Sequence, residues 1–282
     1  MTAVTTGRAR LGPRPAPGLR TALKGTLRSE ATKIRSVRST YWTLVLLVVA
    51  SVVWSVAFCL GEASRWPTMA AQDKAGFDPA QASILGLASL GQLIIVVLGA
   101  LTITSEYSTG MIRTSLTVMP RRGVLYGAKA AVFAAVSLVV AVAASFICFF
   151  AGQQLLASTH VAATLSQPNV LRAVVASALY VAMCGLFAFG LGAILRSTAG
   201  AITAAYGFLF LLPQLAKALP NTWYADVVRW LPGGEVIAEI TSTARQGMDT
   251  HLFSAWGEFA VFGVYTVVVL AVGAVLFLRR DA

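Results

Sequence analysis

Six uncharged apolar blocks, each about twenty residues long, constrain the fold of this 282-residue chain more than any other feature. A bilayer core of about 30 Å is crossed by about 20 apolar residues in an α-helix. Helices are favoured because in lipid each backbone polar group must be satisfied within its own segment. We therefore predict an all-α polytopic membrane protein with six transmembrane helices. The blocks cover approximately residues 41–61, 84–104, 130–151, 173–195, 199–216 and 259–278.

The first and fifth blocks need separate comment. A cleaved signal sequence has a short basic segment and an apolar run of about 7–15 residues. Here 40 residues precede the first block and its apolar run is longer, so we interpret it as a retained span. The fifth block contains Pro213, which lacks an amide donor and should kink or end that helix near its outer end.

The distribution of charge predicts the orientation. Charged residues make up only 12% of the chain, and Lys and Arg outnumber Asp and Glu by 22 to 11. If the N-terminus is inside, the segments 1–40, 105–129, 196–198 and 279–282 are cytoplasmic and hold 16 of the 22 basic residues. By the positive-inside rule, both termini are predicted to lie in the cytoplasm. The excess of basic residues then requires no nucleic acid partner.

The N-terminal segment divides in two. Residues 1–18 are rich in Pro, Gly and Arg without an apolar period, which predicts a disordered tail. Residues 19–282 form a single transmembrane domain. From Leu19 to Tyr41, apolar residues recur every three or four positions with basic residues between them, which predicts an amphipathic helix along the inner leaflet. The alternative is a charge cluster that serves only to orient the chain.

The segment 105–129 connects the second and third blocks. Gly110 can break the preceding helix, and Pro120 ends a short apolar stripe formed by Met111, Ile112, Leu116 and Met119. An exposed stripe of this kind is typical of a surface that binds a partner or the membrane. We predict a short cytoplasmic helix here, with a simple basic turn as the alternative. The outer loop 217–258 is too long to be structureless, and we expect short amphipathic helices in it.

The sequence lacks the residues that catalysis or nucleotide binding would need. Cys59, Cys148 and Cys184 lie in apolar blocks, and the two histidines are far apart, so we predict no metal site. No lysine follows a glycine, which excludes the phosphate-binding loop pattern. The chain is therefore predicted not to be an enzyme and to bind no cofactor of its own. The predicted spans hold no ionisable residue either, so a transporter of this kind would take its energy from elsewhere.

Polar residues do occur within the predicted spans. They can hydrogen-bond between helices or line a translocation path, and the first role is the commoner one. The candidates for a path are Ser89, Gln92, Thr203, Tyr206 and Gln214.

Three segments together resemble the permease subunit of bacterial ABC exporters of the type-2 superfamily. They are LRSEATKIRSVRSTYW before the first block, TSEYSTGMIRTSLTVMPRRGVLYGAK after the second, and LGAILRSTAGAI between the fourth and fifth. The family pattern after the second span is approximately S/T-E-x-x-x-G-T-I-R-x-x-L-x-x-x-P-R-R. Met111 stands where the family commonly has Thr. The matching residues are Ser105, Glu106, Gly110, Ile112, Arg113, Leu116, Pro120, Arg121 and Arg122.

The resemblance implies a half-transporter that works by alternating access in the plasma membrane of a bacterial cell. Residues 19–40 would be the interfacial connecting helix, and residues 105–122 would be a coupling helix that docks into a separate cytoplasmic ABC ATPase. ATP and Mg²⁺ would be bound by that partner. Two permease chains, identical or related, would pair within membrane lipid, with the second and fifth spans lining the path. Glu106→Ala or Arg113→Ala is expected to weaken coupling without unfolding the chain.

A second reading of the same features stays open. A membrane scaffold or anchor that recruits a soluble cytoplasmic partner would show the same topology and the same exposed loop, without transporting anything. Under the exporter reading, the apolar spans with scattered Ser, Thr, Gln and Tyr suit a lipid, an antibiotic or another amphiphile equally.

Overall fold

The computed structural model describes residues 19–112, 117, 121–220, 223, 230, 231, 243 and 255–279. Its regular structure over these residues is helical throughout. Among them, six helical stretches are long and apolar enough to cross a membrane, which confirms the predicted fold class. These stretches are Arg38–Thr68, Pro79–Ser108, Arg122–Thr159, Val170–Leu195, Thr198–Ala216 and Trp256–Arg279.

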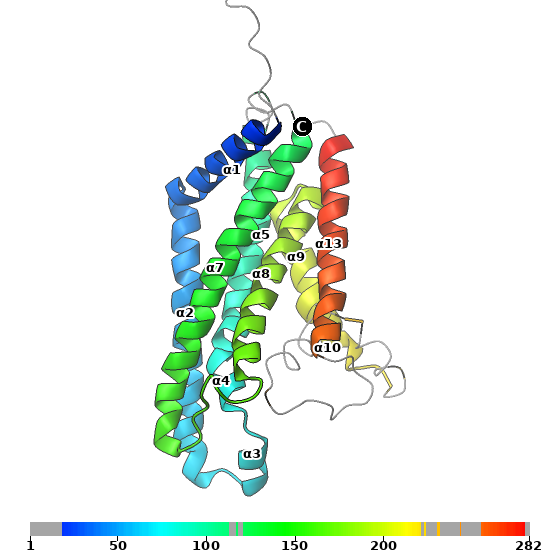
Figure 1. The fold of residues 1–282 in the computed structure, drawn as a ribbon. Coiled ribbons are helices and arrows are strands. Elements are labelled where there is room, and N and C mark those ends of the chain that lie inside the picture. Colours follow the sequence, from blue (N-terminus) through cyan, green and yellow to red (C-terminus); the bar gives the residue numbers. More distant parts are fainter. Residues whose placement is uncertain are drawn as a thin grey trace, which may run out of the picture.

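The six stretches run alongside one another as a bundle (Figure 1). The first three consist of α2 (Arg38–Arg65) with η1 (Trp66–Thr68), α4 (Pro79–Gly86) with η2 (Leu87–Gly91) and α5 (Gln92–Ser108), and α7 (Arg122–Leu156) with η3 (Ala157–Thr159). The second three consist of α8 (Val170–Leu195), α9 (Thr198–Tyr206) with η4 (Gly207–Leu211) and α10 (Leu212–Ala216), and α13 (Ala255–Arg279). A short helix, α3 (Ala71–Gly76), lies between the first two spans.

Helix α1 (Leu19–Ser36) precedes the bundle, where the apolar period predicted a helix. The chain turns at Val37, whose backbone is extended (φ −80°, ψ 106°), before α2 begins. Figure 1 shows α1 inclined across the end of the bundle, where it packs against α7. The last residues of α13 lie at the same end. An even number of crossings requires this arrangement.

The helices continue past the apolar blocks at the end of the bundle where α1 lies. α5 runs on to Ser108, and α7 begins at Arg122, so Glu106 and Lys129 are helical rather than part of a loop. Hydropathy marks only the part of a helix that contacts lipid, and polar turns beyond it stay helical when other helices cover them. Gly110 adopts a positive φ of 69° just after α5, and this confirms the predicted break.

Helix α8 forms the centre of the bundle and contacts α5, α7, α9 and α13. The approach of α5 to α8 is close because Gly99 lies directly against the backbone of Gly185. A Cβ atom built on Gly99 would lie 2.1 Å from the carbonyl oxygen of Gly185. Small residues at such crossings let backbones approach, which is the main source of helix association in lipid.

The second and fifth spans each contain one π-helical turn. In the fifth span, the amide of Leu212 donates to the carbonyl of Gly207, five residues back, just before Pro213. The wider turn accommodates the missing donor and the ring of Pro213, so the helix continues to Ala216 instead of ending. In the second span, the amide of Gln92 donates to Leu87 in the same way. π-turns of this kind are frequent at functional positions.

Several sequence predictions concern residues outside the described part of the chain. These are the disordered tail (1–18), most of the cytoplasmic segment after Ile112, and most of the outer loop 221–254.

Candidate functional site

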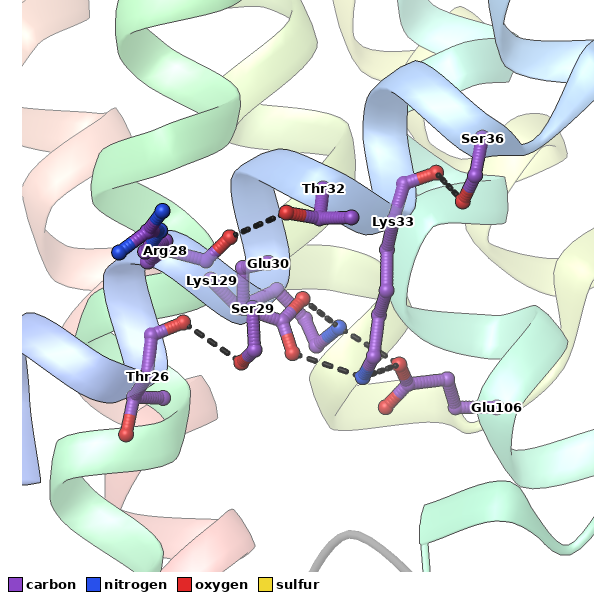
Figure 2. Close-up of polar contacts among 9 residues, drawn as sticks. All are labelled: Thr26, Arg28, Ser29, Glu30, Thr32, Lys33, Ser36, Glu106 and Lys129. Atoms are coloured by element: carbon purple, nitrogen blue, oxygen red, sulfur yellow. Dashed lines mark hydrogen bonds and ion pairs between the residues drawn. The ribbon is translucent and has the colours of Figure 1, made fainter.

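Four charged side chains from three helices meet at the end of the bundle where α1 lies (Figure 2). Glu30 and Lys33 come from α1, Glu106 from the last turns of α5, and Lys129 from the second turn of α7. We call this group the charge quartet. It joins the helices that precede and follow the segment 109–121 to the N-terminal helix.

The geometry is that of a closed network. Lys129 Nζ donates to Glu30 Oε2 and to Glu106 Oε1, each at 2.7 Å. Lys33 Nζ donates to Glu30 Oε1 at 2.8 Å and to Glu106 Oε1 at 3.1 Å. Each lysine therefore bridges both carboxylates, and the two positive charges balance the two negative ones.

Because most of this network is buried, its stability depends on good geometry and complete pairing. The side chains of Glu30 and Lys129 are 5% and 6% exposed and that of Glu106 is 7% exposed, whereas that of Lys33 is 34% exposed. Removing charges from water costs several kcal/mol per ion, which is regained only through good geometry and a full set of partners. These buried ion pairs therefore fix the relative positions of the three helices, because displacement of any one helix leaves a buried charge without its partner.

The pKa values of the two α1 residues follow from this environment. Burial alone raises the pKa of Glu30, but the ammonium of Lys129 and then that of Lys33 outweigh it and lower the pKa below 4.5. Burial alone lowers the pKa of Lys33, but hydrogen bonding and attraction to Glu30 and Glu106 raise it above 10.5. Both residues are charged throughout the physiological pH range.

This electrostatic arrangement predicts the pH dependence of stability. A carboxyl with a lowered pKa contributes stability above its unfolded pKa of 4.5, and the contribution is lost as the pH falls through the folded value. A lysine with a raised pKa contributes below 10.5 and loses the contribution as the pH rises through the folded value. The contribution of these two residues to the thermal unfolding temperature in detergent should therefore stay level between about pH 6 and 9. A step near pH 7 that Glu30→Gln abolishes would contradict this prediction.

Sequence reasoning missed the quartet. It counted Glu30 and Lys129 only as charges on the cytoplasmic side and placed Glu106 at the mouth of a loop. One local signal existed, since Glu30 lies three residues after Leu27 on the predicted apolar face of its helix. A charge on the apolar face of a helix often has a buried partner. Nothing local identified the distant partners, because Lys129 is 99 positions from Glu30 and Glu106 is 73 positions from Lys33.

The predicted coupling residues are only partly described. Glu106 is buried in the quartet, Gly110 has the left-handed backbone noted above, and Ile112 is buried in the main core. Arg121 caps the N-terminus of α7 and Arg122 is its first residue. Arg113, Leu116 and Pro120 lie outside the described residues.

The predicted path residues fall into two groups. Gln92 is fully buried and its Nε2 donates to the hydroxyl of Tyr180 at 3.0 Å, which ties α5 to α8. The hydroxyl of Tyr206 donates to the carbonyl of Leu93 at 2.6 Å, and that of Ser89 donates to the carbonyl of Leu85 at 2.7 Å. Thr203 and Gln214, by contrast, are exposed on the fifth span. Gln92 and Tyr206 hold spans together in this protomer, and Ser89 bonds only within its own span. Thr203 and Gln214 face outward from it.

Metal and thiol chemistry find no support in the described residues. The part of the chain that the structure describes holds no group of three His, Cys, Asp or Glu side chains that could bind a metal ion. Cys59, Cys148 and Cys184 are buried and unbridged, as their positions in apolar blocks predicted.

Comparison with known proteins identifies the family. The sequence model described as "ABC-2 family transporter protein" matches residues 31–282, which includes all six spans and three of the four quartet residues; Glu30 lies one position before the match. No curated protein matches the chain. Because the match extends over most of the chain and agrees with the six-helix fold, the chain is a multi-pass membrane protein and a permease component of an ABC transporter. It belongs to the ABC-2 transporter family.

Proposed function

We propose that this chain is the membrane subunit of an ATP-driven exporter that works by alternating access. A separate cytoplasmic ABC ATPase would dock on the segment 105–122. The observation that carries the coupling part of the proposal is the charge quartet. It connects α5 and α7, which flank that segment, to α1.

The quartet suits a mechanical role. A push on the segment between α5 and α7 would reach Glu106 and Lys129 soon, because Glu106 lies in the last turn of α5 and Lys129 in the second turn of α7. Their mutual ion pair makes these two helix ends move together, and the bonds to Glu30 carry α1 with them. The π-turns at Leu87–Gly91 and Gly207–Leu211 are places where the second and fifth spans can bend in response.

The remaining parts of the proposal concern the assembly. We place both termini in the cytoplasm of a bacterial cell and pair the chain with an identical or related permease. The exposed polar residues of the fifth span, Thr203 and Gln214, would then face the path. Gln92 and Tyr206 would support the path from behind through their helix-to-helix hydrogen bonds, and Ser89 through its bond within the second span.

The first test is isolation of the complex. The tagged chain is extracted from native membranes in mild detergent, and stoichiometric companions are identified. Vanadate-sensitive ATP hydrolysis is then measured in the same sample. An ABC ATPase subunit with that activity supports the proposal. A preparation with an unrelated soluble companion and no ATPase would transfer support to the scaffold reading.

A point variant tests the coupling segment itself. Arg113→Ala is expected to lower the stimulation of ATP hydrolysis by the permease at least about fivefold, at the low end of typical coupling energies. Arg65→Ala is the matched control, because Arg65 is exposed in the last turn of α2, toward the opposite end of the bundle. Equal stimulation in both variants would contradict a coupling role for the segment. Glu106→Ala is a less specific probe than its sequence position suggested, since burial in the quartet makes loss of stability an expected part of its effect.

A further inference from the structure

A cavity of about 310 Å³ opens beside the quartet, between α1, the start of α2 and the end of α5. All four quartet residues line it. Its volume is at the lower end of the range for small-molecule sites, about 300–1,000 Å³. The translocation path argued above lies along the second and fifth spans. This cavity shares α5 with the second span, but α1 and the start of the first span supply its other side, and no residue of the fifth span lines it, so it requires its own explanation.

Glu106, which lines the cavity, carries one buried acceptor atom without a partner among the described residues. Oε1 of Glu106 accepts from both lysines, but Oε2 of the same carboxylate is buried and accepts no hydrogen bond in the described part of the chain. An unsatisfied carboxylate oxygen in a buried position is costly. The group that best satisfies it is a positively charged N–H donor.

The same lining also offers donors. An ammonium carries three N–H bonds, and Lys33 uses two of them within the quartet. Lys33 is also the most exposed member of the quartet. The hydroxyl-bearing residues Ser39, Thr40 and Ser105 line the same cavity. This combination suits an anionic oxygen such as that of a phosphate.

The charge of the quartet favours a ligand that has no net charge. The quartet is neutral as a whole, so a ligand with a net charge would leave an uncompensated charge at a half-buried site. A ligand that carries one ammonium and one phosphate keeps the site neutral and meets both the open acceptor and the open donors.

The rest of the cavity is apolar. Val37, Leu98, Leu101 and Met111 supply its walls, and Leu101 is exposed on the outside of α5. The start of α2 likewise exposes Leu46 and Val49. The cavity therefore combines a polar floor with apolar walls that continue onto the lipid-facing surface, at the level where the basic helix α1 meets the bundle.

We infer that this cavity binds the head of a zwitterionic amphiphile, with a primary ammonium at the Glu106 carboxylate and a phosphate against Lys33. The acyl chains extend along α2 and α5. Phosphatidylethanolamine in the adjoining leaflet has this chemistry, and so would a transported amphiphile with the same head. Occupancy joins α1 and α2 to α5 and stabilises the quartet.

The test uses the purified full chain in detergent and needs no ATPase. Binding is measured by native mass spectrometry and by the rise in thermal unfolding temperature on addition of phosphatidylethanolamine, phosphatidylcholine or phosphatidylglycerol. Phosphatidylcholine has the same charge but no N–H on its nitrogen, so it should bind about tenfold or more weakly, the cost of one charged hydrogen bond. Equal binding of these two lipids, or stronger binding of phosphatidylglycerol, would overturn the inference.

Two variants locate the site. Leu101→Trp fills the cavity and should abolish the preference for phosphatidylethanolamine. Val139→Trp adds the same bulk to α7 at a side chain that is 69% exposed and not part of the cavity lining, and it should keep the preference. If Leu101→Trp does not fold, the comparison of lipids on the unaltered chain still decides the matter. Persistence of the full preference in a folded Leu101→Trp chain would place the binding elsewhere and overturn the inference.

The source of the ligand is a separate arm of the experiment. A fluorescent phosphatidylethanolamine is followed in vesicles that contain the chain with its ATPase. Movement to the other leaflet on addition of ATP identifies the bound molecule as a substrate, and retention identifies it as a resident lipid. Both results support the binding site, and neither depends on the lipid comparison in detergent.

Discussion

Replacement of Lys129 by Met should destabilise the chain by about 3–5 kcal/mol, the usual cost of removing one partner from a buried ion pair. Lys129 is the link between Glu30 and Glu106, at 2.7 Å from each. Without it, two buried carboxylates share the single ammonium of Lys33 and repel each other. The expected result is a large drop in the thermal unfolding temperature in detergent, together with loss of stimulated ATP hydrolysis in the complex.

The double variant Lys129→Met, Glu106→Gln separates charge from packing. It leaves Glu30 and Lys33 as a neutral pair at 2.8 Å, so part of the lost stability should return. We expect the two changes to be non-additive by about 0.5–3 kcal/mol, as for other residues in one network. Lys24→Met, at an exposed position of α1, is the matched control and should change stability by less than about 0.5 kcal/mol. Additive effects of the two quartet variants would mean that they do not form a network.

Substitution of Gly99 by Leu should prevent the native packing of α5 on α8. Even the first side-chain atom would meet the Gly185 carbonyl oxygen at 2.1 Å, and that atom belongs to the backbone and cannot rotate away. Gly99→Ala is therefore expected to cost about 1–3 kcal/mol, as overpacked positions do, and Gly99→Leu more. The measurement is the yield of monodisperse protein in detergent and its unfolding temperature.

Gly127 provides the control for Gly99. It is also a helical glycine, but it is exposed on α7 and an added Cβ would meet nothing within 4 Å. Gly127→Ala should leave stability unchanged or raise it by up to about 1 kcal/mol, because alanine is the better helix former. Similar losses from Gly99→Ala and Gly127→Ala would refute the close approach of α5 and α8.

The membrane spans and the helix break after the second span could be predicted because they depend on local sequence. A helix in lipid satisfies its backbone within its own segment, so composition over about twenty residues is enough to identify a span. For the same reason Gly110 could be recognised as a helix breaker, and its positive φ agrees. The pattern from Ser105 to Arg122 could be matched to a family without any knowledge of its surroundings.

The outer end of the fifth span could be predicted only in part. Pro213 correctly marked a disturbance in the helix, since its ring and missing amide are local properties. Whether the helix ends or bends depends on how the preceding turn adjusts. The structure shows a π-turn over Gly207–Leu211 and a helix that continues to Ala216.

The sequence by itself determined six spans, a helix before them, the break after the second span and the family. Only the tertiary structure decided that Glu30 meets Lys129, that Gly99 rather than another of the many small residues faces Gly185, and that a cavity lies beside the quartet. The physical reason is the range of the interactions. Hydropathy and backbone hydrogen bonding act within a segment, whereas ion pairing and close packing depend on which helices lie next to each other. The six helices have similar composition, so the sequence of one helix does not show which of the others it will contact.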